Sequence, residues 1–525
     1  MFKRIVALLA IMTLCISVVT VAGADTAPEV LAEQFAYVTE GLDLEKTIEI
    51  KWYGHNTAGY IPNSDASIKR TLEKLFNVVI TDVEVDTFNE DQLNLMKGTG
   101  MEFDVATMSI DFAEWSELGL LREINADDVK NYMPNLYNPL VNAVGDDWTT
   151  YASVNGKLFG IPVISQSYTN PITLGVRKDW LEAVGYTEDK LPDTLEELEE
   201  LLLKFRTDDP DGNGKEDTYA IDTFDEGYFC EYPLGAYGVS KRYWYNDAEG
   251  KPMWYAVDEN YKEALKVIQR WYKEGILDPE VVSDGNNETT AKIIEEKIGA
   301  YYGTDWGFCT GHDKSPVKKA AAEGKTLNMI VIPPVIGPTG IRGSTQYASS
   351  VITSGLAFGR KCTDEAMIRI MQIINATFGD KDFFRYLFMG EKDVYYTEDE
   401  LGYATTTDAK TSENMHLHGI QRYIFFSFNP STTYEWRTEK SRLEMNRIVR
   451  NMPTIKPNLV AGFKTEAEIE YQASVDKIAD TFFWKAVIGD LDVDAEWDAY
   501  VANWYAAGGK EIFEQKLALY EQMKQ

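Results

Sequence analysis

The chain has 525 residues, and its 84 acidic side chains outnumber its 51 lysines and arginines, which gives a formal net charge of −33. That charge argues against partners such as nucleic acids and anionic membranes. It also disfavours a strongly anionic ligand unless a local basic pocket compensates. Roughly five hundred mature residues exceed a single hydrophobic core, so we expect two lobes.

Residues 1–24 have the pattern of an export signal. A positive start and an apolar run over 5–21 precede Ala22-Gly23-Ala24, an A-x-A cleavage site. Cys15 follows Met12-Thr13-Leu14, which lacks the small residue that a lipid-modification site needs. We therefore expect an exported protein, periplasmic or at the cell surface, and the sequence leaves lipid anchoring open.

The other cysteines, Cys230, Cys309 and Cys362, have no metal-binding spacing. An odd, sparse set is not a disulfide framework, although one pair can form in an oxidising compartment. His416 and His418 are spaced to share one face of a strand. Two histidines alone are more typical of a polar surface than of a metal site.

Strand and helix patterns alternate from residue 47 onward. The segments 47–52, 78–85 and 103–108 have strand patterns, and 67–76 and 112–118 have helical ones. This order predicts an α/β fold with a mostly parallel sheet flanked by helices. Ligands of such sheets sit beyond the carboxyl ends of the strands. The first site candidates, at those ends, are Trp52, Tyr53, His55, Ser109 and Asp111.

A second set of elements follows a passage between lobes near 165–173. Thr194 and Glu197 stand in capping-box register before an apolar stripe, and 261–274 has an amphipathic pattern that Gly275 ends. Helical patterns dominate the last part of the chain. We expect a signal peptide at 1–24, lobe I from 25–170 and lobe II from 171–345. The chain then returns to lobe I over 346–440, and a helical C-terminal region at 441–525 packs on the lobes.

Oxygen-bearing residues alternate along 209–217. The spacing resembles the first nine positions of an EF-hand calcium loop, and Gly212 and Gly214 permit the tight path that turns such donors inward. The chelating glutamate of the twelfth position is missing, since Ala220 stands there. The alternative interpretation is a solvated turn. Candidate calcium ligands are Asp209, Asp211, Asn213, Asp217 and the backbone carbonyl of Lys215, with Glu216 or Asp222 needed to close the site.

Taken together, the motifs resemble the extracellular solute-binding proteins of ABC importers, family 1, in the subgroup of large lipoprotein-like sugar binders. The resemblance covers nearly the whole mature chain, and its motifs are specific in combination. They are Gly175-Val-Arg-Lys-Asp-Trp-Leu-Glu-Ala-Val-Gly185, Leu191-Pro-Asp-Thr-Leu-Glu-Glu-Leu198, Asp209-Pro-Asp-Gly-Asn-Gly214, Trp271-Tyr-Lys-Glu-Gly-Ile-Leu-Asp-Pro279, the Pro333-Pro334 to Gly337-Pro338 loop, Ile488-Gly489, Trp497-Asp-Ala-Tyr-Val501 and Gly508-Gly509.

The resemblance implies two α/β lobes that close on a ligand in the cleft, in a monomer that serves permease subunits. It also implies a structural calcium at 209–217, far from the ligand. Two departures stand out. The family pattern often has an acidic residue after the last aspartate, where this chain has Thr218, and many relatives end their signal in a lipid-modified cysteine.

A sugar-binding cleft stacks aromatic rings on sugar faces and bonds hydroxyls with carboxylates and amides. Any single aromatic residue is more often part of the core. Trp271, Trp497 and Trp504 lie on helical stripes, and we expect them in the core. The predicted ligand contacts are Trp52, His55, Asp111, Tyr168, Trp306, Tyr347 and Trp436, with Tyr434 as a further loop candidate.

Two other classes of function remain open at the level of sequence. A secreted, calcium-stabilised glycosidase or lyase needs only a pair of placed carboxylates, and an acidic chain supplies such pairs by chance. No nucleophile elbow, zinc-protease helix or phosphate-binding loop is present. The same two-lobed architecture also serves peptide binders and proteins that feed a sensor kinase.

Overall fold

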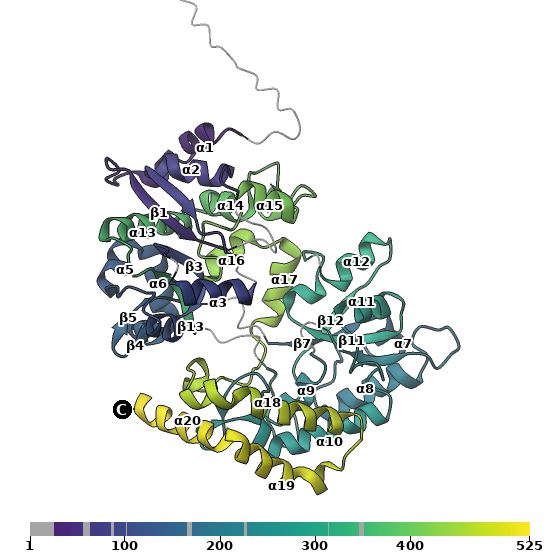
Figure 1. Cartoon of the computed structure of the whole chain (residues 1–525). Coiled ribbons are helices and arrows are strands. Elements are labelled where there is room, and N and C mark those ends of the chain that lie inside the picture. The colour runs from purple at the N-terminus through teal and green to yellow at the C-terminus, as the bar shows by residue number, and fades with distance from the viewer. Residues whose placement is uncertain are drawn as a thin grey trace, which may run out of the picture.

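Figure 1 shows a computed structural model of the chain as two α/β lobes, with helix α17 (Lys440–Val449) between them. The described residues are 26–55, 63–85, 89–100, 102–164, 171–224, 228–312, 314–345 and 351–524. The predicted signal peptide, Tyr168 and Tyr347 lie outside them.

The first lobe is built on a five-stranded sheet of order β2-β1-β3-β13-β6. Strand β1 runs parallel to β2 and β3, whereas β13 runs antiparallel to β3 and β6. The chain leaves this lobe along β6 and returns along β13, so the two strands run in opposite directions. The bounds are β1 Ile48–Tyr53, β2 Val78–Asp82, β3 Val105–Asp111, β6 Gly160–Ile164 and β13 Val351–Phe358.

Helices cover this sheet and bury its apolar side chains in one continuous core. Helix α2 occupies the segment predicted from its apolar stripe, and its buried Ile68, Leu72 and Phe76 recur at helical spacing. The helices are α1 Pro28–Gln34, α2 Ser67–Phe76, α3 Glu90–Thr99, α4 Phe112–Glu117, α5 Ala126–Tyr132, α6 Pro134–Val144, α13 Asp364–Gly379, α14 Lys381–Met389, α15 Ser412–His418 and α16 Ser431–Arg437.

The second lobe has a four-stranded sheet of order β12-β7-β11-β8. Strand β11 is parallel to β8 and antiparallel to β7, and β7 is antiparallel to β12. Both sheets are therefore mixed, but only β13 in the first and β7 in the second run against the other strands, so each sheet is mostly parallel in strand direction and the predicted α/β fold class is confirmed. The bounds are β7 Thr173–Arg177, β8 Tyr219–Asp222, β11 Ile298–Gly303 and β12 Met329–Ile332.

Helices flank the second sheet as well. The predicted capping box is present at the start of α8, where the Thr194 side chain and the Glu197 side chain each accept a hydrogen bond from the other residue's backbone N–H. The helices are α7 Lys178–Ala183, α8 Leu195–Thr207, α9 Glu231–Ala236, α10 Glu259–Lys273, α11 Asn286–Ile294 and α12 Pro316–Ala322.

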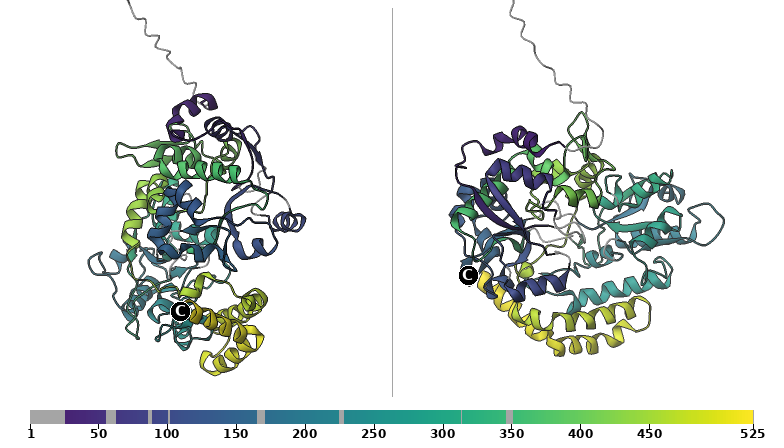
Figure 2. Two further views of the ribbon diagram at one scale, coloured as in Figure 1. Left: turned by 90° about the vertical axis from the view of Figure 1, so that its left-hand side faces the viewer. Right: turned by 45° about the horizontal axis from the view of Figure 1, so that its top comes forward.

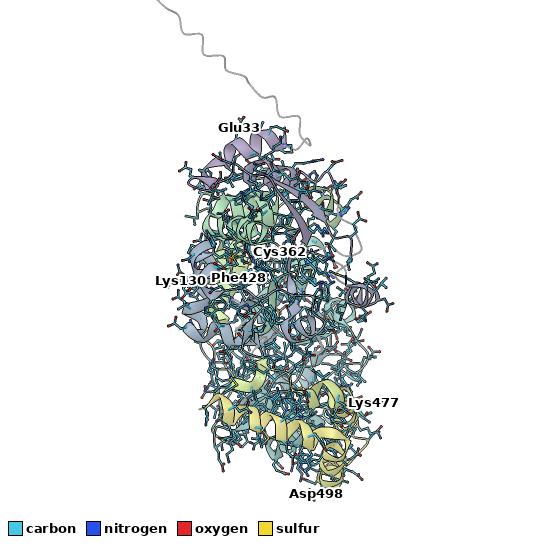
Figure 3. All side chains as sticks on the ribbon, turned by 60° about the vertical axis from the view of Figure 1, so that its left-hand side comes forward. Glu33, Lys130, Cys362, Phe428, Lys477 and Asp498 are labelled. Atoms are coloured by element: carbon cyan, nitrogen blue, oxygen red, sulfur yellow. The ribbon has the colours of Figure 1, made fainter. Side chains whose placement is uncertain are left out.

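Three C-terminal helices, α18 Glu466–Val487, α19 Val493–Trp504 and α20 Lys510–Met523, share the core of the second lobe. They run beside α10 (Figure 2), and Trp497 Nε1 donates to Glu259 Oε1 at 2.7 Å. Lys477 and Asp498 lie on the exposed side of these helices (Figure 3). Trp271, Trp497 and Trp504 are buried, which confirms their predicted place in the core.

Short elements complete the fold. They are the two-residue strands β4 Ser153–Val154, β5 Lys157–Leu158, β9 Tyr245–Asn246 and β10 Pro252–Met253, the hairpin strands β14 Tyr396–Glu398 and β15 Ala404–Thr406, and the short helices η1 Ala36–Thr39, η2 Asp146–Ala152, η3 Tyr255–Val257, η4 Asp305–Phe308, η5 Leu459–Gly462 and η6 Tyr505–Gly509.

Cys230, Cys309 and Cys362 are buried free thiols. His416 and His418 lie on helix α15 and not on a strand, because the cap at Thr411 starts a helix there. Among the described residues, no helix has the length and apolar character needed to cross a membrane.

The segments that pass between the lobes pair with one another. The Ile172 backbone N–H donates to the Thr345 carbonyl at 2.9 Å, and Ser344 donates to the Pro453 carbonyl at 3.2 Å. Ser344 in turn accepts from the Ile455 N–H at 2.9 Å. The passages after β6, before β13 and after α17 therefore meet at one place. This is the arrangement of a hinge, because few residues absorb any rotation of the lobes.

Candidate functional site between the lobes

A cavity of about 540 Å³ is lined by side chains from both lobes. The second lobe contributes α12 and the segment that precedes it, and the first lobe contributes α14, α15, the end of β15 and the turn after it. Other hollows, of about 620 and 1070 Å³, lie beside the C-terminal helices within the second lobe. The interlobe pocket is lined by Gly311, His312, Lys318, Phe388, Thr406, Thr407, Asp408, Lys410, Met415, Gln421, Arg437, Thr438, Glu439 and Arg442.

Helices α16 and α17 form one wall of this pocket and are tied to both lobes. On the second lobe, the buried carboxylate of Asp305 accepts a hydrogen bond from the Tyr434 hydroxyl and one from Arg442 Nε at 3.1 Å. On the first lobe, the buried Arg385 guanidinium donates to the Trp436 carbonyl. The wall is thereby fixed at both ends, which holds the side chains between them in place.

Arg437 is the last residue of α16 and is half-buried in the pocket wall. Its guanidinium donates to the side-chain oxygen of Asn429 and lies 4.7 Å from the centre of the Phe388 ring. Phe388 is itself stacked on Phe426, with ring centres 5.8 Å apart. A neutral amide and an aromatic face therefore position this cation.

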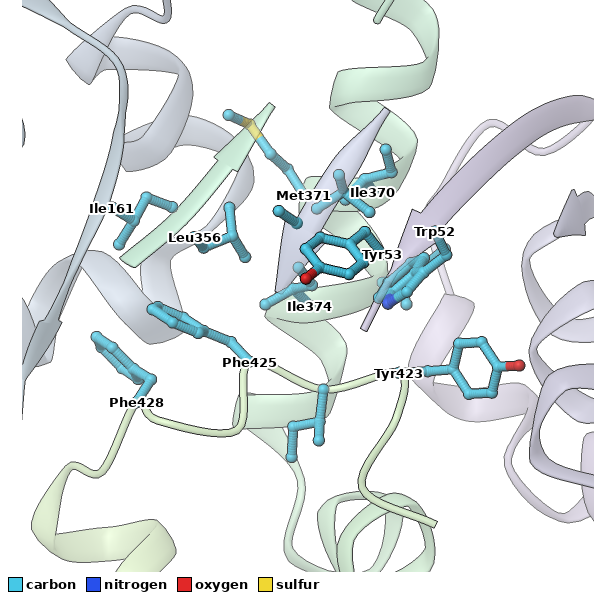
Figure 4. Packing of buried hydrophobic residues seen from close by; sticks show 14 of the residues in the cluster. Trp52, Tyr53, Ile161, Leu356, Ile370, Met371, Ile374, Tyr423, Phe425 and Phe428 are labelled. Carbon is cyan, nitrogen blue, oxygen red and sulfur yellow. The ribbon is translucent and has the colours of Figure 1, made fainter. Parts of the chain in front are cut away.

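The predicted contact Trp52 lies in the core of the first lobe. Its ring is fully buried and packs edge-on against Tyr423 at 5.7 Å (Figure 4). Asp111 caps α4, where its carboxylate accepts the Glu114 N–H at 2.9 Å. Neither residue lines the interlobe pocket.

His55 follows β1 and stacks on Phe426, with ring centres 4.2 Å apart and an interplanar angle of 2°. Burial disfavours its charged form and the Arg422 guanidinium repels it, which together lower the pKa of His55 to about 4. The imidazole is therefore neutral at physiological pH. It reaches the pocket indirectly, because Phe426 stacks on the lining residue Phe388.

Trp306 lies directly behind the pocket lining, and Trp436 lies one ring further from it. The Trp306 ring is 9% exposed and contacts the rings of His312, at 4.6 Å, and Phe224, at 5.5 Å. Trp436 packs edge-on against Phe384 at 5.6 Å. Of the sequence-predicted contacts that the structure describes, Trp306 and Tyr434 touch lining residues directly. In contrast, His55 and Trp436 reach the lining residue Phe388 through one intervening ring.

The lining residues Arg437, Arg442 and Lys410 were not predicted from the sequence. The sequence pattern indicated rings near glycine, aspartate or histidine, because those residues mark strand ends, whereas Arg437 lies at a helix end. A usable signal existed: in a chain of net charge −33, two arginines closely follow Tyr434 and Trp436. Basic side chains beside aromatic ones are typical of binding surfaces.

The predicted calcium loop has inward-turned donors. Asp209 and both glycines, Gly212 and Gly214, have positive φ. The Asp209 carboxylate accepts the backbone N–H groups of Asn213, at 3.1 Å, and Gly214, at 2.9 Å. The Asn213 amide bridges the carboxylates of Asp211 and Asp217 at 2.6 and 3.1 Å. These residues thus converge on one another, as ligands of one cation would.

The charges of this loop also suit a cation. Partial burial raises the pKa of Asp211, and the neighbouring Asp209 and Asp217 raise it further. The Lys297 ammonium lies 2.5 Å from Asp217 and already offsets one of these charges. Ala220, at the twelfth position, is buried and offers no side-chain ligand.

Asp222 does not complete the loop. It belongs to a separate cluster with Asp278 and Asp284, whose oxygens lie within 4.8 Å of one another. Lys292 Nζ sits in that cluster, 3.0 Å from Asp278 and 2.5 Å from Asp284. Burial, together with the charge of Asp278, raises the pKa of Asp222 to about 7. A lysine therefore already supplies the positive charge that this cluster needs.

No family model matches the chain, but curated relatives do. The polygalacturonan/rhamnogalacturonan-binding protein YtcQ of Bacillus subtilis is 25% identical over 481 residues, which cover 88% of this chain and 89% of YtcQ. The fructooligosaccharide ABC transporter substrate-binding protein FusA of Streptococcus pneumoniae is 25% identical over 348 residues, 62% of this chain and 58% of FusA.

Solved structures share the fold. A FusA EF-hand mutant in complex with fructo-nystose has a TM-score of 0.64 at 19% identity, covering 91% of this chain and 99% of its own. An HMO-binding, ABC-transporter-associated solute-binding protein from Bifidobacterium longum infantis has a TM-score of 0.69 at 18% identity, covering 91% of this chain and 99% of its own. The chain is thus similar over most of its length to the binding protein YtcQ, and it shares the fold of ABC-transporter solute-binding proteins such as FusA.

Proposed function

We propose that the protein captures an oligosaccharide in the pocket between its lobes and delivers it to permease subunits of an ABC importer. The observation that carries this proposal is a pocket whose lining comes from both lobes and whose wall, α16 to α17, is hydrogen-bonded to both. A ligand there contacts both lobes at once, so it stabilises the closed form over the open form. The ligands in the names of YtcQ and FusA support a sugar.

The lining has the chemistry that a sugar needs. The hydroxyl and amide groups of Thr407 and Gln421 line the pocket beside the buried, apolar ring of Phe388. Glu439 and Asp408 supply carboxylates that accept hydrogen bonds from sugar hydroxyls. Apolar and polar groups together orient a bound sugar, and binding needs no reactive side chain.

We propose Tyr168 and Tyr347 as ligand contacts from the sequence alone, since both lie outside the described residues. Trp306, Trp436 and His55 support the lining from behind. The residues Trp52 and Asp111 act through the packing of the first lobe. The division into segments 25–170, 171–345, 346–440 and 441–525 belongs to the same proposal, with the last segment packed mainly on the second lobe.

We also propose a structural calcium ion at 209–217, held by Asp209, Asp211, Asn213, Asp217 and the Lys215 carbonyl. The convergent side chains support it, and an EF-hand is named for the similar FusA structure. The ion would neutralise the clustered carboxylates and fix the turn that follows α8. Export by the signal at 1–24 and monomeric action complete the proposal.

A thermal-shift screen of the mature protein tests the sugar assignment. The probes are fructo-oligosaccharides, oligogalacturonides, monosaccharides and short peptides, because a ligand that binds only the folded state raises the melting temperature by mass action. We expect a rise with one class of oligosaccharide. A rise with peptides alone would overturn the assignment.

A further inference from the structure

The interlobe pocket is basic within a strongly acidic protein. Its lining holds the cationic side chains of Lys318, Lys410, Arg437 and Arg442, against the carboxylates of Asp408 and Glu439. The whole chain has the opposite balance, with a net charge of −33. A local excess of positive charge inside a cleft of an anionic protein concentrates field at that cleft and attracts anionic ligands.

The cations of the pocket differ in how they are neutralised. Arg442 is paired with the buried Asp305 carboxylate, at 3.1 Å from Nε, so its charge is already balanced. Arg437, in contrast, donates to the neutral amide of Asn429 and lies over the Phe388 ring. Among the residues that the structure describes, no carboxylate forms an ion pair with Arg437. This guanidinium is therefore held in place by neutral groups and keeps its full charge for another partner.

When the lobes close on a ligand, the Arg437 guanidinium loses water and an ionic partner becomes more favourable. Arg437 is half-buried at the end of α16, and a ligand in the pocket removes the remaining water from it. A charge that loses water without an ionic partner costs free energy, whereas a bidentate arginine–carboxylate pair offsets that cost. A carboxylate on the ligand meets this need, and its planar geometry matches the guanidinium fork.

The two acidic lining residues limit how much negative charge the ligand carries. Glu439 lies beside Gly311 and accepts from the Thr406 hydroxyl at 3.5 Å, and Asp408 is exposed at the rim. Both repel a dense polyanion such as a polyphosphate. They accept hydrogen bonds from hydroxyl groups, so the fitting ligand carries spaced carboxylates and many hydroxyls.

We infer that the ligand is an acidic oligosaccharide, built from sugars that carry carboxylates, and that Arg437 binds one of those carboxylates. This inference rests on the proposed function, because it assigns the substrate class of the same pocket. Arg437 then selects among oligosaccharides, while Phe388 and the polar lining groups recognise features common to all of them.

Calorimetric titration with matched probes tests the inference. The probes are an oligogalacturonate, its methyl ester, which has the same sugars without the charge, and a sulfated and a neutral oligosaccharide of similar length. We expect the acid to bind the wild-type protein at least about tenfold more tightly than the ester, as charge-assisted hydrogen bonds give. Arg437→Gln should bring the acid's affinity down to that of the ester.

Arg447→Gln is the matched control, since Arg447 is exposed on α17 and lies outside the pocket lining. It should leave the tenfold preference unchanged. Arg437→Lys keeps the charge without the planar fork and should fall between the wild type and Arg437→Gln. If Arg437→Gln fails to fold, the ratio of the wild-type protein's affinities for the acid and for the ester alone decides whether the ligand class is acidic.

The outcomes separate this inference from the proposed function. If the ester or the neutral oligosaccharide binds as tightly as the acid, the acidic class is wrong and oligosaccharide binding stands. If only the sulfated sugar binds, the carboxylate assignment is wrong. If none of the four probes binds, both the inference and the proposed function fail.

Discussion

At the scale of single residues, Trp306 connects the core of the second lobe to the pocket. The sequence favoured it as an exposed stacking platform, but its ring is buried between Phe224 and His312. Only His312 of this group lines the pocket. Trp306 therefore acts on the ligand through the position of His312, and its first contribution is to stability.

Replacing Trp306 with alanine tests this role. We expect Trp306→Ala to lower the free energy of unfolding by about 3 kcal/mol, since truncating a buried aromatic ring leaves a cavity. Ligand affinity should fall as well, because His312 loses its support. Trp484→Ala, which removes a ring stacked on Phe229 far from the pocket, should lower stability and spare affinity. Urea unfolding and calorimetry measure both, and an unchanged stability of Trp306→Ala would restore the platform role.

His55 makes the stability of the first lobe depend on pH. Its pKa, about 4, lies below its ordinary value of 6.5, so the unfolded chain binds a proton at a pH where the folded chain does not. The stability that neutral His55 contributes is thus complete above about pH 6.5 and is lost as the pH falls towards 4. We expect the wild type to lose up to about 2 kcal/mol more than His55→Gln between pH 7 and pH 4.5. Parallel urea-unfolding profiles for the two proteins would contradict this.

At the scale of elements, the loop 209–217 joins α8 to β8 and is the place where a cation would act. Calcium should raise the free energy of unfolding of the wild type by about 2.7 kcal/mol when it is present at about a hundred times its dissociation constant. Asp211→Ala should remove that gain. The control Asp208→Ala changes a carboxylate bonded to Lys204 and Thr207 outside the loop, and it should keep the gain. An equal effect of calcium on all three proteins would leave the loop a simple turn.

The helices that the sequence predicts well are those whose position is determined by residues close together in the chain. Helix α2 follows from an apolar stripe and α8 from the capping box of Thr194 and Glu197. Strand direction has a distant cause, because β13 runs antiparallel only through the return of the chain from the other lobe. The pocket also has a distant cause, since His312 and Arg437 meet only after the lobes assemble. The local periodicity of the sequence therefore predicts neither the direction of β13 nor the residues that line the pocket.

At the scale of the whole molecule, the pocket, the hinge and helices α16 and α17 act together to couple ligand binding to the rotation of the lobes. The passages that meet at Ile172, Ser344 and Ile455 allow the lobes to rotate, while α16 and α17 hold a wall of charged side chains between them. Only a ligand that contacts both lobes shifts such an equilibrium. The pocket and hinge therefore favour a reversible binder.

The most direct test is a calorimetric titration of the mature protein with an oligosaccharide that raises its melting temperature, followed by mass spectrometry of the recovered sugar. We expect saturable binding at one site per chain and a sugar recovered intact. We also expect a smaller radius of gyration by X-ray scattering once the sugar is bound, because the lobes close. A sugar recovered in cleaved form, or saturable binding of peptides with none of oligosaccharides, would contradict the proposed function.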